Sequence, residues 1–402
     1  MTNNVIKLAP QQIKFLQYEL NSNSRGSQNA GIAFEIKGPI DFNRLDQALA
    51  ILVKKHDAFL MNLTYDNTNN LVHQMNDFTI QWIKHQNIEN AHQAMDEARN
   101  EVLKPMDLFN QPLFEFHQYL LSNDHAFLLI KASHIIVDGP SFTAIYMQLT
   151  SLYENLESDI KTFSFKEFIN LETQYASSPM GKKSIAYWQE QQRSISSIIT
   201  VEDIKNIQLI EALNPSNKLD LGIIKKVARK HKTSIFNIVL FLYSKALANL
   251  FKSNDFIVGY TLTNRFQDEM RYMVGLTTHC VRLSLQDINH TTIHELMDDV
   301  KKQVTQNFTH FIVAESIEIP SFTLSYLSET IKLPDFKGLE VIKHPFNSNL
   351  KYNDSNFTLL CNERVDYIEL SINCDNDIFS NQFNQNLYTQ MQVEMNNMFN
   401  QE

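Results

Sequence analysis

The sequence predicts an α/β fold built from two similar lobes. At 402 residues, the chain is long enough for two lobes of about 150 to 220 residues, each with its own core. Short apolar runs that are typical of strands alternate with amphipathic helices, and the order of strands and helices is repeated in the two halves. A single histidine motif lies in the first half, directly after a continuously apolar run.

Composition and charge exclude several classes of protein. The chain is 43% hydrophobic and 11% aromatic, which is ordinary for a globular enzyme. A net charge of −10 without a basic cluster argues against a nucleic-acid surface. No apolar run approaches about 18 residues and the first six residues are largely polar, so we expect no membrane span and no signal peptide.

Cofactor and metal motifs are missing from the sequence. There is no phosphate-binding glycine loop, no dinucleotide fingerprint and no zinc-ligand spacing, so we expect no metal and no permanently bound cofactor. Cys280, Cys361 and Cys374 follow no ligand spacing, which favours free thiols and a cytoplasmic location.

The elements expected in the first half follow from periodicity and turn residues. Alternation over residues 30–37 predicts a strand that ends at Gly38-Pro39, and Asp41 is placed to cap the next helix. The remaining patterns predict a helix at 11–18, a helix to residue 52, a hairpin at 63–75, a helix at 91–102 and a strand at 113–120.

The stretch around His134 is the centre of the prediction. Residues 127–130 are continuously apolar, which suits a strand buried on both faces. Asp138, Gly139 and Pro140 then interrupt the chain, and proline suits the first turn of a helix. The Gly139 amide would then lie at a helix N-terminus, where free N–H groups favour negative charge. A histidine there is suited to remove a proton while amides face an oxyanion.

The second half repeats this kind of pattern. Residues 158–181, with a helix at 165–175, are expected to link the lobes. Beyond them the patterns predict a helix at 235–250, a strand at 256–260, an amphipathic helix at 293–308, strands at 322–327, 357–361 and 367–372, and a last helix.

These motifs, taken in order, resemble the condensation domains of nonribosomal peptide synthetases and the wider chloramphenicol-acetyltransferase-like acyltransferases. The resemblance covers nearly the whole chain, and that order carries more weight than any single motif. The matching segments are Leu8-Ala9-Pro10-Gln11-Gln12, Lys55-His56-Asp57-Ala58-Phe59-Leu60, Ser133-His134-x-x-x-Asp138-Gly139, Tyr187-Trp188, Gly259-x-x-x-x-Asn264-Arg265, Val274 to Leu283 and Phe322 to Leu327.

The resemblance implies a fold and a site. It implies two chloramphenicol-acetyltransferase-like lobes, at 1–176 and 177–402, in a V-shaped pseudo-dimer with a channel between them. His134 would be the base, with Ser133 and Gly139 beside it, and Asp138 would pair structurally with an arginine of the second lobe. The arginine candidates are Arg265, then Arg282, and the second-lobe channel candidates are His279, Ser325 and Tyr326.

The resemblance also implies a reaction and its partners. We expect a freestanding, monomeric condensation enzyme that takes an acyl or aminoacyl thioester from the phosphopantetheine arm of a separate carrier protein. The acceptor would be a small-molecule amine or alcohol. An acyl-CoA-dependent O- or N-acyltransferase of the same fold is one alternative, and an epimerization domain is a more distant one.

Four positions depart from the family pattern and leave a non-enzymatic alternative open. Serine replaces the first histidine of the motif, leucine replaces an arginine, and histidine and serine replace two asparagines, at Ser133, Leu60, His279 and Ser325. A condensation-like domain without activity, which recruits partners to a carrier-bound chain, would also show such departures.

Overall fold

The structure is a computed structural model that describes residues 5–21, 25–156, 161–193, 201–209, 215–312, 319–328, 336–346 and 357–400. The chain divides into two compact units. Unit 1 comprises Met1–Ser178, Thr263–Thr278 and Leu333–Tyr352, and unit 2 comprises Pro179–Leu262, His279–Lys332 and Asn353–Glu402.

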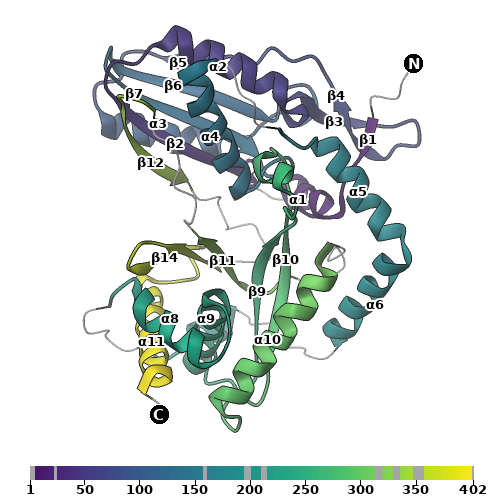
Figure 1. The fold of residues 1–402 in the computed structure, drawn as a ribbon, viewed down its shortest axis with the longest axis vertical. Coiled ribbons are helices and arrows are strands. Elements are labelled where there is room, and N and C mark those ends of the chain that lie inside the picture. Colours follow the sequence, from purple (N-terminus) through teal and green to yellow (C-terminus); the bar gives the residue numbers. More distant parts are fainter. Residues whose placement is uncertain are drawn as a thin grey trace. The chain divides into compact units, whose positions relative to one another are not determined.

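Unit 1 is built on a five-stranded sheet in the order β12-β2-β7-β6-β5. The strands β5 and β6 are parallel, and the other neighbouring pairs are antiparallel. The edge strand β12 comes from late in the sequence and lies beside β2 (Figure 1). The bounds are β2 Asn29–Lys37, β5 Trp82–His85, β6 Phe114–Ser122, β7 His125–Ser133 and β12 Glu340–Phe346.

The middle of the central strand β7, residues 126–130, is apolar because both of its faces are covered. Leu128 and Ile130 belong to the large core, which also contains buried residues of α2 and α4. Phe127 and Leu129 point to the other face, into a smaller core that includes buried alanines of α3. Each such side chain stabilises the fold by about 1.5–3 kcal/mol relative to exposure.

Helices and a small second sheet complete unit 1. Asp41 and Asn90 are the N-cap residues of α2 and α3, and each side chain accepts a hydrogen bond from a backbone amide in the first turn of its helix. The two caps therefore set the first residues of these helices. The helices are α1 Pro10–Asn21, α2 Phe42–Lys55, α3 Ala91–Leu103, α4 Gly139–Asn155 and α5 Phe165–Ser177, with 3-10 turns Asp57–Leu60 and Asp268–Tyr272. The second sheet has the order β1-β4-β3, from Val5–Lys7, Leu71–Met75 and Met61–Tyr65.

Unit 2 contains a six-stranded sheet in the order β10-β9-β11-β13-β14-β8. Strand β11 is parallel to β9 and β13, whereas β14 is antiparallel to both of its neighbours. The strands are β8 Lys218–Asp220, β9 Phe256–Thr263, β10 Thr278–Leu285, β11 Phe322–Ser328, β13 Phe357–Glu363 and β14 Tyr367–Cys374. The helices are α6 Pro179–Arg193, α7 Val201–Lys205, α8 Leu221–Lys230, α9 Ile235–Phe251, α10 Ile293–His310 and α11 Asn381–Asn400.

The mixed α/β fold expected from the sequence is confirmed, while the lobes 1–176 and 177–402 remain a prediction. The compact units differ from a single cut near residue 176, because two later segments, Thr263–Thr278 and the one that contains β12, pack with the first unit. No pairing of strands so distant in sequence can be read from local periodicity.

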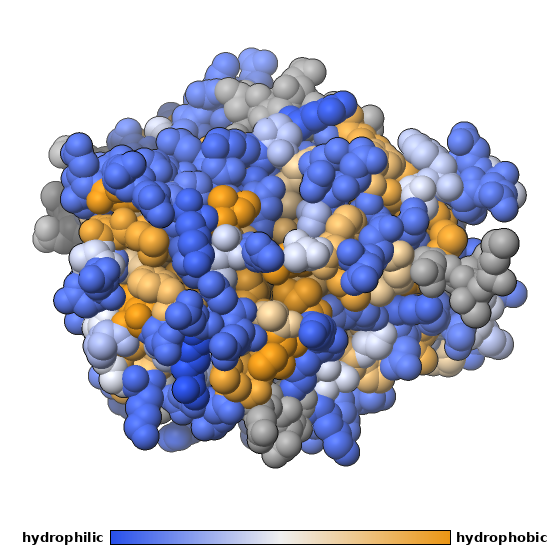
Figure 2. Space-filling model, turned by 90° about the horizontal axis from the view of Figure 1, so that it is seen from above, coloured by the Kyte–Doolittle hydropathy of each residue, from blue (hydrophilic) through white to orange (hydrophobic). Residues whose placement is uncertain are grey.

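The surface is mixed in polarity. On the face shown in Figure 2, hydrophobic side chains lie in separate groups between hydrophilic ones. No single helix among the described residues is long and apolar enough to cross a membrane. The pair α8 and α9 passes that test by length and composition when joined, but the two helices are bent by 100°. The three cysteines are free.

Candidate functional site

His134 stands in the short loop between β7 and α4. Its backbone amide donates to the Gln28 carbonyl at 2.8 Å, which continues the pairing of β7 with the start of β2. Its ring is half-buried and stacks on Phe15, with centroids 5.2 Å apart and planes at 17°. The backbone hydrogen bond and the stacking on Phe15 together restrict the position of the His134 ring.

One tautomer of His134 follows from its hydrogen bond. Nδ1 lies 3.0 Å from the Val137 carbonyl oxygen, which can only accept, so Nδ1 carries the hydrogen. Burial lowers the pKa of His134, and this outweighs the opposing effects of the Val137 carbonyl and the Asp138 charge. At neutral pH the imidazole is therefore neutral with a lone pair on Nε2. Within the part of the chain that the structure describes, Nε2 has no hydrogen-bond partner.

Asp138 begins helix α4. Its side chain accepts the Ser141 amide at 3.0 Å, and the Ser141 hydroxyl lies 3.4 Å from the Asp138 amide, which makes a capping box. Gly139 is the first residue of the helix and is exposed. A Cβ atom added at Gly139 would meet nothing within 4 Å, so the space beside this helix terminus is open.

The Asp138 carboxylate is enclosed by donors. Oδ1 accepts from Ser141 Oγ at 2.7 Å and from Arg265 Nη2 at 2.9 Å. Oδ2 accepts from the Thr277 amide at 2.9 Å, from the Thr277 hydroxyl at 2.7 Å and from the Thr278 hydroxyl at 3.1 Å. Burial alone would raise the pKa of Asp138, but the Arg265 charge and the hydrogen bonds from Ser141 and Thr277 outweigh it, so the pKa is lowered.

The structure brings Arg265 to Asp138, as the first of the two arginine candidates. Its Nε donates to Thr277 Oγ1, Nη1 donates to the Met270 and Met273 carbonyls, and Nη2 also reaches the Gly275 carbonyl. The two side chains are only 6% and 3% exposed. Arg265 was expected in a second lobe, yet its segment belongs to unit 1, so this ion pair is internal to the unit that carries His134.

Ser133 ends β7 and is buried. Its hydroxyl accepts a hydrogen bond of 3.4 Å from the Ile135 amide, and its own amide donates to the Leu113 carbonyl. The hydroxyl therefore stabilises the turn that leads to His134. Leu60 packs against the large core, and His56 is buried, with Nε2 3.1 Å from Gln148 Oε1.

The remaining candidates lie in unit 2. Arg282 is buried on β10, where its carbonyl accepts from Asn307 at 2.7 Å. His279 is buried edge-on to Phe311, at 5.2 Å between ring centroids. Ser325 is half-buried on β11, and the Tyr326 hydroxyl donates to Glu363 at 2.7 Å.

Sequence reasoning missed several residues that build the site. Ser141 and Thr277 join Asp138 and Arg265 in one hydrogen-bond network, and Gln12 and Phe15 contact the His134 loop from α1. The serine three residues after Asp138 is a capping signal that was available in the sequence. Thr277 offered no comparable signal, because its pairing spans 139 positions.

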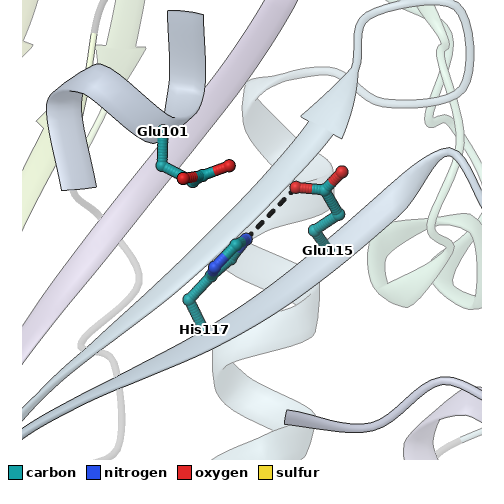
Figure 3. Close-up of side chains that lie close together, drawn as sticks. All are labelled: Glu101, Glu115 and His117. Carbon is teal, nitrogen blue, oxygen red and sulfur yellow. Dashed lines mark hydrogen bonds and ion pairs between the residues drawn. The ribbon is translucent and has the colours of Figure 1, made fainter. Parts of the chain in front are cut away.

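A second polar cluster lies on the α3 side of the same sheet. Figure 3 shows Glu101, Glu115 and His117, whose ligand atoms all lie within 4.8 Å of one another. The buried Lys131 ammonium group is 2.9 Å from Glu115 Oε2, the oxygen that also faces His117 Nε2 at 3.2 Å. A divalent ion there would lie beside a buried cation, so these side chains fit an ion-paired network better than a metal centre.

The comparisons with known proteins show the family. The family described as "Condensation domain" matches residues 2–313. This chain belongs to the condensation-domain family, whose general reaction is acyl or aminoacyl transfer from substrates bound to the phosphopantetheine of a carrier protein.

Curated relatives are long synthetases. The chain is 23% identical over 310 residues to tyrocidine synthase 2 of Brevibacillus parabrevis, which covers 75% of this chain and 8% of that protein. It is 19% identical over 366 residues to bacitracin synthase 3 of Bacillus licheniformis, which covers 86% of this chain and 6% of that protein. The chain thus spans less than a tenth of the length of these two relatives.

Solved structures show the same fold at low identity. The condensation domain of the monacolin K polyketide synthase matches with a TM-score of 0.83 and 16% identity, covering 98% of both chains. A mutant of the starter condensation domain of rhizomide synthetase, in complex with C8-CoA, matches with a TM-score of 0.80 and 14% identity over 98% of this chain and 95% of that one.

Proposed function

We propose that this condensation domain transfers an acyl or aminoacyl group from a carrier-protein thioester to an amine or hydroxyl acceptor, with His134 as the base. The observation that carries the proposal is the neutral His134 ring, whose Nδ1 hydrogen is bonded to Val137 and whose Nε2 is left to accept. It stands beside the open N-terminus of α4 at Gly139.

The proposed step needs no covalent enzyme intermediate, because a thioester is already activated. Nε2 of His134 accepts a proton as the acceptor nitrogen or oxygen attacks the thioester carbonyl and the new C–N or C–O bond forms. The C–S bond of the tetrahedral intermediate then breaks, and the leaving sulfur takes the proton back from Nε2 of His134, so that phosphopantetheine leaves as the free thiol. Amides at the start of α4 are suited to face the oxyanion.

The test compares donors and variants in one assay. The same acyl group is offered on a purified carrier protein and on coenzyme A, with a panel of amines and alcohols, and products are followed by mass spectrometry. His134→Gln should lower turnover by about 10²- to 10⁴-fold, the usual contribution of a general base. The matched control is His92→Gln, since His92 is an exposed histidine of α3 whose side chain is 87% accessible.

Each outcome separates the alternatives. Product from the carrier donor that disappears in His134→Gln, with an unchanged melting temperature, supports the proposal. Turnover from coenzyme A alone would assign the chain to the acyl-CoA-dependent acyltransferases. The assay includes coenzyme A as a donor because the rhizomide starter domain has been solved in complex with C8-CoA. Tight carrier binding without product from either donor would instead support a recruiting module.

A further inference from the structure

We propose that helix α1 is a clamp that fixes the position of His134 and limits its contact with water, with Gln12, Phe15 and Glu19 as the positioning residues. The three side chains follow each other at intervals of three and four residues, which places them on one face of the helix. The inference builds on the proposed role of His134, but the contacts themselves are independent of that role.

Gln12 holds the backbone just after His134. It is fully buried, and its Nε2 donates to the Ile135 carbonyl at 2.6 Å and lies 2.8 Å from His73 Nε2. Its Oε1 accepts the Ala9 amide at 2.8 Å, so the side-chain amide is satisfied at both ends. Because all of its hydrogen bonds are made, the buried Gln12 side chain has a fixed orientation. Its bond to the Ile135 carbonyl therefore also fixes the position of the loop backbone next to His134.

Phe15 covers the imidazole itself. The two rings are nearly parallel, at 17° with 5.2 Å between centroids, and both are half-buried. The phenyl ring occupies one face of the imidazole, while the Val137 carbonyl fixes the Nδ1 edge. These two contacts occupy one face and the Nδ1 edge of the ring, so a substrate can approach His134 at the Nε2 edge.

Glu19 holds the strand that holds His134. Its buried carboxylate accepts the Gly26 amide at 2.6 Å and the Gln28 amide at 3.1 Å. The Gln28 carbonyl in turn accepts the His134 amide at 2.8 Å. Glu19 therefore acts on His134 through one intervening residue, Gln28, which accepts the His134 amide, whereas Gln12 binds the carbonyl of the next residue, Ile135.

The first test reads His134 directly by NMR, without any substrate. In protein labelled with ¹⁵N-histidine, the His134 signals are assigned by their loss in His134→Gln, and the tautomer and pKa are followed by titration. Phe15→Leu should raise the pKa of His134 toward its ordinary value, because the ring face becomes hydrated, and should reduce the share of the Nδ1–H tautomer. Phe15→Tyr keeps the stacked ring and should restore both.

The second test reads the backbone and the rate. Glu19→Gln and Gln12→Leu should each speed hydrogen exchange at the His134 amide and lower kcat by about tenfold or more, since small misplacements of a reacting group are costly. Gln17→Ala, on the exposed side of α1, should change none of these quantities.

The outcomes distinguish this inference from the proposed function. If Phe15→Leu lowers the melting temperature but leaves the pKa and tautomer of His134 as in the parent protein, α1 is only structural and the clamp is refuted. If the NMR and exchange changes occur while His134→Gln keeps full turnover, the clamp stands and the catalytic role of His134 fails.

Discussion

Replacing Asp138 by alanine should destabilise unit 1 by about 3–5 kcal/mol, the usual cost of leaving a buried charge without its partner. Six donor atoms lose the Asp138 carboxylate as an acceptor: Ser141 N and Oγ, Thr277 N and Oγ1, Thr278 Oγ1 and Arg265 Nη2. Arg265 keeps its bonds to the Met270, Met273 and Gly275 carbonyls, which places the expected loss toward the lower end of this range.

The capping contribution can be separated with a second aspartate of the same unit. Asp41 caps α2 by accepting the Arg44 amide at 3.0 Å, but it is exposed. Asp41→Ala should therefore cost only about 1 kcal/mol, the typical value for an N-cap. The difference between the two variants measures the buried network around Arg265.

The assay is urea denaturation followed by tryptophan fluorescence. The chain has two tryptophans, Trp82 in unit 1 and Trp188 in unit 2, so a Trp188→Phe background reports on unit 1 alone. The reasoning is refuted if Asp138→Ala costs no more than Asp41→Ala, because the Arg265 pair would then contribute nothing beyond an exposed cap.

Further predictions concern pH and two glycines. Burial lowers the pKa of both His56 and His73 to about 4. Because the unfolded chain binds these protons near pH 6.5, the free energy of unfolding should fall by about 1.5 kcal/mol per histidine between pH 6.5 and 5. Urea denaturation of His73→Leu at several pH values should show that the slope of this free energy against pH is smaller by the contribution of one proton. An unchanged slope would contradict the prediction. Gly275→Ala should destabilise unit 1 strongly, since its Cβ would lie 2.2 Å from a Phe165 ring carbon, whereas Gly139→Ala should leave the melting temperature unchanged; equal losses in thermal melts would refute the contrast.

Local signals predicted the motif region well. The apolar run at 127–130 lies in β7, and α4 begins at Gly139 with Pro140 in its first turn, because each of these features depends on residues only a few positions apart. The choice of Arg265 over Arg282 came from the resemblance to a family, since a side-chain pair 127 positions apart leaves no local pattern.

Long-range pairings explain what the sequence did not reveal. The edge strand β12 joins β2 across some three hundred residues, and its segment has no turn or periodicity that names its partner. Likewise the opening helix was recognised as a motif, but its contacts with His134 depend on how α1 packs, which sequence spacing alone does not determine.

The late arrival of β12 has a consequence during protein synthesis. Residues 29–37 can pair with β7 once residue 133 has been made, but their other edge stays open until residues 340–346 are made. At about 5–20 residues per second, a ribosome needs roughly ten seconds to most of a minute for that interval. During this time β2, a strand that becomes almost fully buried, offers free backbone amides and carbonyls to any neighbouring chain. A nascent chain of this protein should therefore depend on chaperones that cover strand edges until β12 has been translated.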